Sequence, residues 1–213
     1  MKWTDDCWPL LLQVYLRKPA GVKPLYSRAL VELALELHVH PRVLFNKQCE
    51  LASLSSPGVA RLWQTYADSP RRLGKTVARL RAMRGFSHAD TFYEGVALNE
   101  TFERDFRPIA GCEPLTPAML ALTLDLYFRL TPATMVARTP EVAALAQTMR
   151  VPVAAVTGAL EAFQHCDPYL KRGAGTAGPL AEACRQVWQR YGNRQPSELE
   201  AVATQLRDYF VTG

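Results

Sequence analysis

Apolar residues recur at helical spacing along most of the chain, and polar segments with proline or glycine separate the resulting stripes. The first stripe follows Thr4 and comprises Trp8, Leu11, Leu12, Tyr15 and Leu16. This is the spacing of one face of an amphipathic helix. Comparable patterns predict helices over about 27–38, 41–51, 115–130, 179–191 and 196–210, with further helices beginning at Pro57 and Pro70.

A small hydroxyl residue followed by proline marks most of the predicted helix starts. The hydroxyl can cap the first turn, and proline fits the first helical position because no hydrogen bond is needed from its nitrogen there. The pairs are Ser56-Pro57, Ser69-Pro70, Thr116-Pro117, Thr131-Pro132 and Thr139-Pro140. Proline therefore starts helices in this chain more often than it interrupts them.

Strand signals are scarce. Val31, Leu33, Leu35 and Leu37 alternate with other residues and could be read as a strand, but alanine, leucine and glutamate between and around them favour a helix. No Asn-Gly or Asp-Gly turn joins two alternating segments. The pattern predicts an all-α fold, a multi-helix bundle.

The composition is that of a folded protein, and its charge is unevenly distributed. Hydrophobic residues make up 48% of the 213 residues and charged residues 21%, which excludes general disorder. The net charge is +5, but residues 41–84 carry nine basic side chains against two acidic ones, whereas residues 85–128 carry seven acidic against two basic. The basic half could meet an acidic partner.

Two halves of the sequence echo each other. The segment PGVARLWQTY from Pro57 matches PEVAALAQTM from Pro140, and LRAM from Leu80 matches LEAF from Leu160. A duplicated helical unit of roughly 80 residues is the simplest account, and chance similarity between amphipathic helices is the alternative. We expect an N-terminal helical half at 1–86, an acidic and aromatic connector at 87–114, and a C-terminal helical half at 115–213.

Short segments in both halves resemble the helix-turn-helix superfamily. From Leu145 to Val156, Ala146 is the small residue that lets two helices cross and Val151 is the apolar residue after the turn. The segment from Leu33 to Leu44 fits similarly. Arg150 and His38 stand where that family often has glycine. As a whole the chain resembles bacterial helical proteins of an uncharacterised family, which implies no function.

The chemistry suited to nucleic acid lies outside the segment with the best motif. The helix after Pro152 offers small side chains that cannot read base edges, so we expect it to pack on another helix or on a partner. Donor groups are found in two other places. The candidate nucleic-acid-binding residues are Arg42, Asn46, Lys47, Arg71, Arg72, Lys75 and Arg79.

Two functions follow from this chemistry. The first is a helix-turn-helix-like protein associated with DNA or RNA, or a regulator of transcription. The alternative is a non-catalytic scaffolding module that binds another protein or a second copy of the chain. A solvated basic face, or one paired with the acids of 90–113, would account for the same arginines without a partner. Six phosphate contacts would give a slope near −5 for log affinity against log salt.

No catalytic, cofactor or metal site is predicted. Gly74-Lys75-Thr76 lacks the earlier glycine and the strand of a phosphate loop. His38 and His40 have only Cys49 nearby as a soft ligand, and His165-Cys166-Asp167 are neighbours that point in different directions along a helix. Five widely spaced cysteines, an acidic N-terminus unlike a signal peptide and no long apolar segment lead us to expect a cytoplasmic location away from membranes.

Overall fold

The computed structural model describes residues 3–83, 101–170, 173 and 177–211. In these residues it contains eleven α-helices and no strand, so the predicted all-α fold is confirmed. The chain divides into two compact units. One comprises Met1–Glu100 with Thr212–Gly213, and the other comprises Thr101–Val211.

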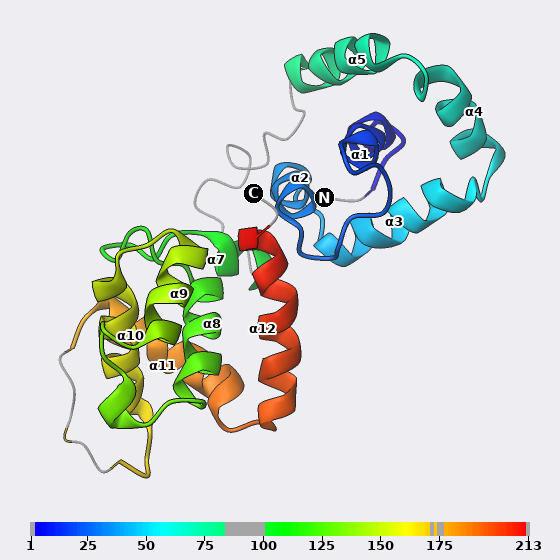
Figure 1. Cartoon of the computed structure of the whole chain (residues 1–213). Helices are drawn as coiled ribbons and strands as arrows, with labels where there is room; N and C mark the ends of the chain where they lie inside the picture. Colours follow the sequence, from blue (N-terminus) through cyan, green and yellow to red (C-terminus); the bar gives the residue numbers. More distant parts are fainter. Residues whose placement is uncertain (1–2, 84–100, 171–172, 174–176, 212–213) are drawn as a thin grey trace. The chain divides into compact units, whose positions relative to one another are not determined.

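Helix α1 (Cys7–Leu16) is the centre of the first unit. Cys7, Leu10, Leu11, Leu12 and Val14 are all buried, which leaves this helix almost no exposed face. It packs against α2 (Arg28–Leu37), α3 (Pro41–Ser53), α4 (Pro57–Tyr66) and α5 (Pro70–Ala82). These four helices are arranged around α1 in Figure 1. The alternating segment at 31–37 is therefore helical, as part of α2.

Left-handed residues end three of the helices. His38 after α2, Leu54 after α3 and Arg150 after α9 have φ values of 51°, 48° and 57°. In each case the left-handed residue and the one after it donate backbone hydrogen bonds to carbonyls of the last helical turn. This arrangement satisfies carbonyls that would otherwise have no partner at a helix end.

The second unit is built around α8 (Pro117–Tyr127). Nine of its eleven residues are buried, from Ala118 to Tyr127 with the exception of Met119. Around it lie α7 (Thr101–Phe106), α9 (Pro140–Met149), α10 (Val153–Cys166), α11 (Pro179–Val187) and α12 (Pro196–Val211), as Figure 1 shows. A short 3-10 turn at Pro132–Thr134 and a π-helical turn at Trp188–Gly192 complete the unit.

An ion-pair network joins α8 to α12. The carboxylate of Asp125, which is only 8% exposed, accepts hydrogen bonds from Arg129 at 2.6 Å and from Arg207 at 2.7 Å. A buried carboxylate needs such partners, since removing it from water without them costs several kcal/mol. Asp125 thus fixes the side of α8 that faces α12.

The predicted connector at 87–114 falls partly outside the described residues, which do not include 87–100. Its remaining part, residues 101–114, is counted with the second unit and contains α7. The echo between the two halves stays a prediction. Its segments at Pro57 and Pro140 begin α4 and α9, each with proline in the first turn.

Candidate nucleic-acid interface

Helix α5 divides into an apolar face and a basic face. Leu73 and Val77, four residues apart, are 2% exposed, and α5 packs on α1. The basic residues occupy the other side of the helix because their spacing turns them away from this buried pair. Exposed side chains on that side are Arg71, Arg72, Lys75 and Arg79, which we call the α5 basic face.

Helix α5 itself supplies no acid to neutralise the α5 basic face. The helix sequence PRRLGKTVARLRA contains five basic residues and no acid. Within the described part of the chain, none of the four residues of the face forms an ion pair with a carboxylate; Arg72 lies over the ring of Tyr66, 5.6 Å from its centroid. Four positive charges therefore stand on one helix facing water.

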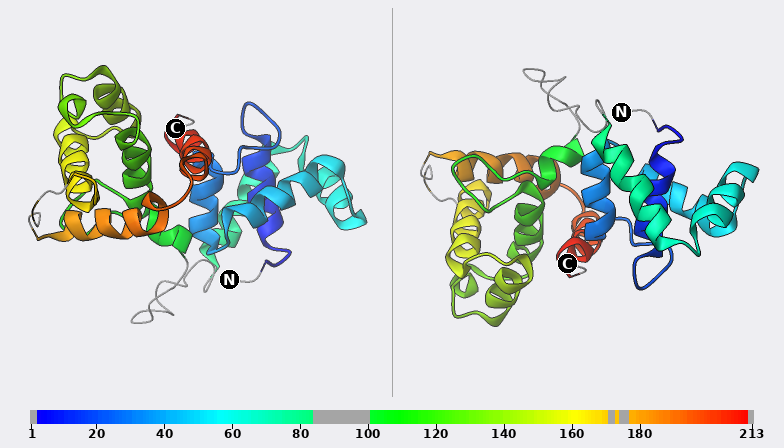
Figure 2. Two further views of the ribbon diagram at one scale, coloured as in Figure 1. Left: turned by 90° about the horizontal axis from the view of Figure 1, so that it is seen from below. Right: turned by 90° about the horizontal axis from the view of Figure 1, so that it is seen from above.

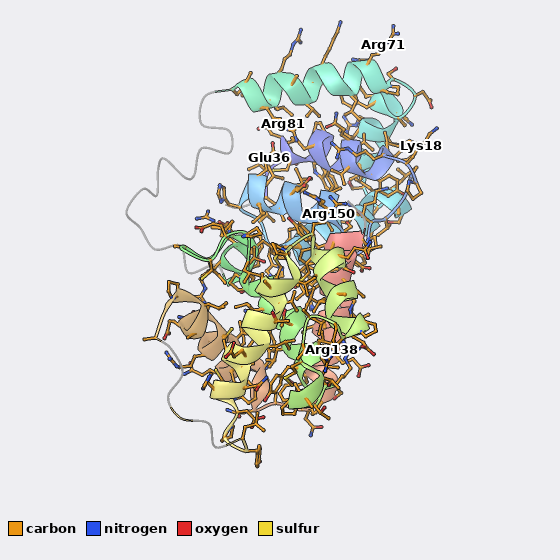
Figure 3. The ribbon with its side chains drawn as sticks, turned by 60° about the vertical axis from the view of Figure 1, so that its left-hand side comes forward. Lys18, Glu36, Arg71, Arg81, Arg138 and Arg150 are labelled. Carbon is orange, nitrogen blue, oxygen red and sulfur yellow. The ribbon has the colours of Figure 1, made fainter. Side chains whose placement is uncertain are left out.

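The fifth basic residue of α5 has a structural role. The guanidinium of Arg81 donates two hydrogen bonds to the carboxylate of Glu36 in α2, at 2.6 and 2.8 Å. These bonds raise the pKa of Arg81. In Figure 3 Arg81 points toward Glu36, whereas Arg71 points away from the body of the unit. Forty-five residues separate the two partners, so no local pattern could have predicted the pair.

The arrangement of α5 is unfavourable for the helix on its own. Arg71 and Arg72 occupy the first turn, which contains no acidic residue and whose Ser69 cap makes no side-chain hydrogen bond. Positive charge there opposes the helix dipole, at a cost of about 0.3–1 kcal/mol per charge. Lys75 also lies four residues from both Arg71 and Arg79, a spacing at which like charges repel. Stability of the isolated helix does not account for this charge pattern.

The three candidates on α3 differ from one another. Arg42 and Asn46 are exposed, one turn apart on the same side of the helix. Lys47 is held within the protein: its Nζ lies 2.8 and 2.9 Å from the carboxylate oxygens of Glu50 and 5.3 Å from the centroid of the Trp8 ring. The charge of Lys47 is thus already balanced.

The candidates on α3 and α5 do not form one surface. Helix α1 lies between the two helices, with α5 on one side and α3 on the other (Figures 1 and 2). A surface shared by all seven residues would need the two helices on one side of α1. The α5 basic face is the larger group, and it is separated from the exposed residues of α3 by α1.

In both segments that resemble a helix-turn-helix, a short turn joins two helices. Residues 38–40 join α2 to α3 and residues 150–152 join α9 to α10, and in each the first turn residue is left-handed although it is not glycine. The small residues Ala34 and Ala146 are buried. The chain bends by 113° between α9 and α10.

Helix α10 packs on α11 within the same unit. Its Gly158 lies close to Leu180 of α11, since a Cβ atom built on this glycine would be 3.9 Å from a Leu180 methyl group. The small residues of α10 thus allow a close approach of α11. The expectation that this helix packs on another helix agrees with the contact.

The histidines and the aspartate that were considered as metal or catalytic residues take part in hydrogen bonds within the chain. Nδ1 of His40 accepts a hydrogen bond from the backbone N–H of Arg42 and so caps α3. His165 is hydrogen-bonded through Nδ1 to the Gly173 carbonyl, while Asp167 accepts from the hydroxyl of Tyr127 at 2.7 Å. Among the described residues, no group of three or more histidine, cysteine, aspartate or glutamate side chains is placed to hold a metal ion.

In the described ranges, no single helix is both long enough and apolar enough to span a membrane. Helices α9 and α10 meet the length and composition criteria only when they are taken together, and the chain bends sharply between them. Comparisons with protein-family models, with curated proteins and with solved structures found no significant match to this chain.

Proposed function

We propose that this protein associates with DNA or RNA by binding the phosphate backbone through the α5 basic face, and that its role there is regulatory rather than catalytic. The observation that carries the proposal is that Arg71, Arg72, Lys75 and Arg79 have no carboxylate partner among the residues that the structure describes. Exposed guanidinium and ammonium groups along one helix suit a row of phosphates. Such contacts supply affinity and carry no sequence information of their own.

The two helix-turn-helix-like segments contribute to the proposal unequally. Helix α3 leaves Arg42 and Asn46 exposed, and both side chains have donors that base edges can accept. Helix α10 is packed on α11, and its exposed side chains are Ala154, Glu161 and His165. Contacts to base edges, which would give sequence specificity, therefore belong to α3.

The alternative function, a scaffolding module for another protein or a second copy, has less support. The sequence offered α10 as the surface for a partner helix, and α11 of the same chain occupies part of it. The exposed large apolar side chains of the described residues are spread over different elements, such as Val22, Leu54 and Tyr169. Single exposed apolar residues of this kind are normal on protein surfaces.

The test is a salt titration of binding to a DNA duplex and to single-stranded DNA and RNA. Four phosphate contacts predict a slope of log affinity against log salt of about −3.6 for a duplex and about −2.8 for a single strand. Lys75→Ala and Arg79→Ala should each make the slope shallower by about one. Arg138→Ala, an exposed arginine of the second unit, is the control. A flat salt dependence, or no binding at about 50 mM salt, would refute the proposal.

A further inference from the structure

The second unit contains a cavity of about 320 Å³ that the α5 proposal does not involve. It lies between α7, the segment after it at residues 107–110, the start of α8 and one side of α11. Its wall is mainly apolar and includes Ile109, Pro117, Pro179, Ala183 and Val187. The volume is at the lower end of the range of small-molecule pockets, which is about 300–1,000 Å³.

The two carboxylates that line this cavity already have cationic partners. Asp105 accepts hydrogen bonds from Arg190 at 2.9 and 2.7 Å, and Glu182 accepts one from Arg185. Burial raises the pKa of Asp105, and the bonds from Arg190 act against that rise. Arg190 therefore stabilises the charged form of the half-buried Asp105 carboxylate. Neither acid is available to attract a cationic ligand.

The charge that remains at the rim is positive. Arg104 lines the cavity and is exposed; its charge attracts that of Asp105 through space, but no described carboxylate is within ion-pair distance of it. Arg107 pairs with Glu103 at 3.3 Å. Pro117 and Pro179 are the first residues of α8 and α11, so two helix N-termini border the same space. Their partial positive charge adds to that of Arg104.

We propose that this cavity binds a small organic anion with an apolar body, such as a medium-chain or aryl-substituted carboxylate. The body would pack on Ile109, Ala183 and Val187, and the anionic group would lie at the rim beside Arg104. An apolar wall with an exposed arginine at its edge is complementary to a ligand of this chemistry. Binding here does not depend on whether the α5 basic face binds nucleic acid.

The test uses the full chain and two probes, octanoate and 3-phenylpropionate, titrated by calorimetry and by amide chemical-shift changes. We expect saturable one-site binding of at least one probe, with shifts centred on α7 and α11. Arg104→Ala should weaken it about tenfold, the effect of losing one charge-assisted hydrogen bond. Octanol, which has the same chain length and no charge, should bind at least tenfold more weakly than octanoate.

A second test fills the cavity by substitution. Ala183→Leu adds a side chain into the space and should abolish binding, whereas Ala201→Leu, at an exposed position of α12, should leave it unchanged. Thermal unfolding of both variants checks that they fold. If Ala183→Leu does not fold, the result for Arg104→Ala still decides the test. Absence of saturable binding by both probes would overturn the proposal. Equal affinity for octanol, or unchanged binding by folded Ala183→Leu, would do the same.

Discussion

Arg71 lies in the first turn of α5, where its charge opposes the helix dipole, and its side chain points away from the protein (Figure 3). Replacing it with glutamate should raise the free energy of unfolding by about 0.3–1 kcal/mol, since a negative charge is favourable at that end. The same change should weaken nucleic-acid binding, because it turns a phosphate contact into a repulsion. Chemical denaturation and a binding titration on one preparation measure both effects.

Arg61→Glu is the matched control for this prediction. Arg61 is exposed on α4, in the same unit, and the substitution changes the net charge by the same amount. We expect a stability change within about 0.5 kcal/mol and a smaller loss of binding. If Arg71→Glu destabilises the protein instead, then Arg71 has a structural role that its exposure does not reveal.

At the scale of residues, composition and local spacing predicted part of the candidate site. The four-residue spacing of Leu73 and Val77 was enough to place Arg72, Lys75 and Arg79 on the opposite side of α5, and the structure has Arg71 exposed with them. The same reasoning also selected Lys47, whose charge is balanced by Glu50 in the next turn and by the ring of Trp8. The contact with Trp8 joins two helices, and such contacts are not encoded in local spacing.

Leu54 ends α3 in the left-handed conformation, with φ 48° and ψ 43°, and its side chain is 43% exposed. A residue with a Cβ atom is strained there by roughly 1 kcal/mol or more, and glycine is not. Leu54→Gly should therefore raise the free energy of unfolding by about 0.5–1 kcal/mol. The measurement is urea denaturation followed by far-ultraviolet circular dichroism.

Leu54→Ala separates backbone strain from the loss of the leucine side chain. Alanine keeps the Cβ atom, so this variant should show no gain in stability. A gain of equal size in both variants would mean that removal of an exposed apolar side chain, rather than relief of the left-handed strain, is responsible.

Asp125 makes the α8–α12 contact sensitive to a single substitution. Asp125→Ala removes the common partner of Arg129 and Arg207 and should lower the free energy of unfolding by about 1–3 kcal/mol. The loss is smaller than for a fully buried pair because both arginines are partly exposed. Thermal unfolding measures the change. Arg185→Ala, which breaks an exposed pair, should cost no more than about 1 kcal/mol.

At the scale of elements, the hydroxyl-proline starts predicted the first residues of α4, α5, α8 and α9 correctly. That success has a local cause, because proline fits the first turn by its own geometry. The hydroxyl caps the helix at Ser56 and Thr116 but makes no capping hydrogen bond at Ser69 or Thr139. The cavity beside α11 was not predicted. It is formed by residues 104–117 and 179–190, and their approach depends on how both segments pack around α8.

For the whole molecule, the uneven charge distribution matters more than the total. The α5 basic face contributes four of the 25 basic residues, and these four lack carboxylate partners in the described part of the chain. If nucleic-acid binding were a general effect of a net charge of +5, any two arginines or lysines would contribute equally. If the interface is localised on α5, the loss of binding depends on which basic residues are replaced and not only on how many.

Two double variants with the same net charge separate these cases. The first, Arg71→Gln with Lys75→Gln, removes half of the α5 basic face, and the second, Arg138→Gln with Arg150→Gln, removes two exposed charges from the second unit. Both lower the net charge by two. We expect the first variant to make the duplex salt slope shallower by about 1.8, to about −1.8, and the second to leave it near −3.6. Fluorescence anisotropy over about 50–200 mM salt measures both slopes. Equal slopes for the two variants would show that the binding follows net charge, and the α5 basic face would then be a solvated surface without a specific role.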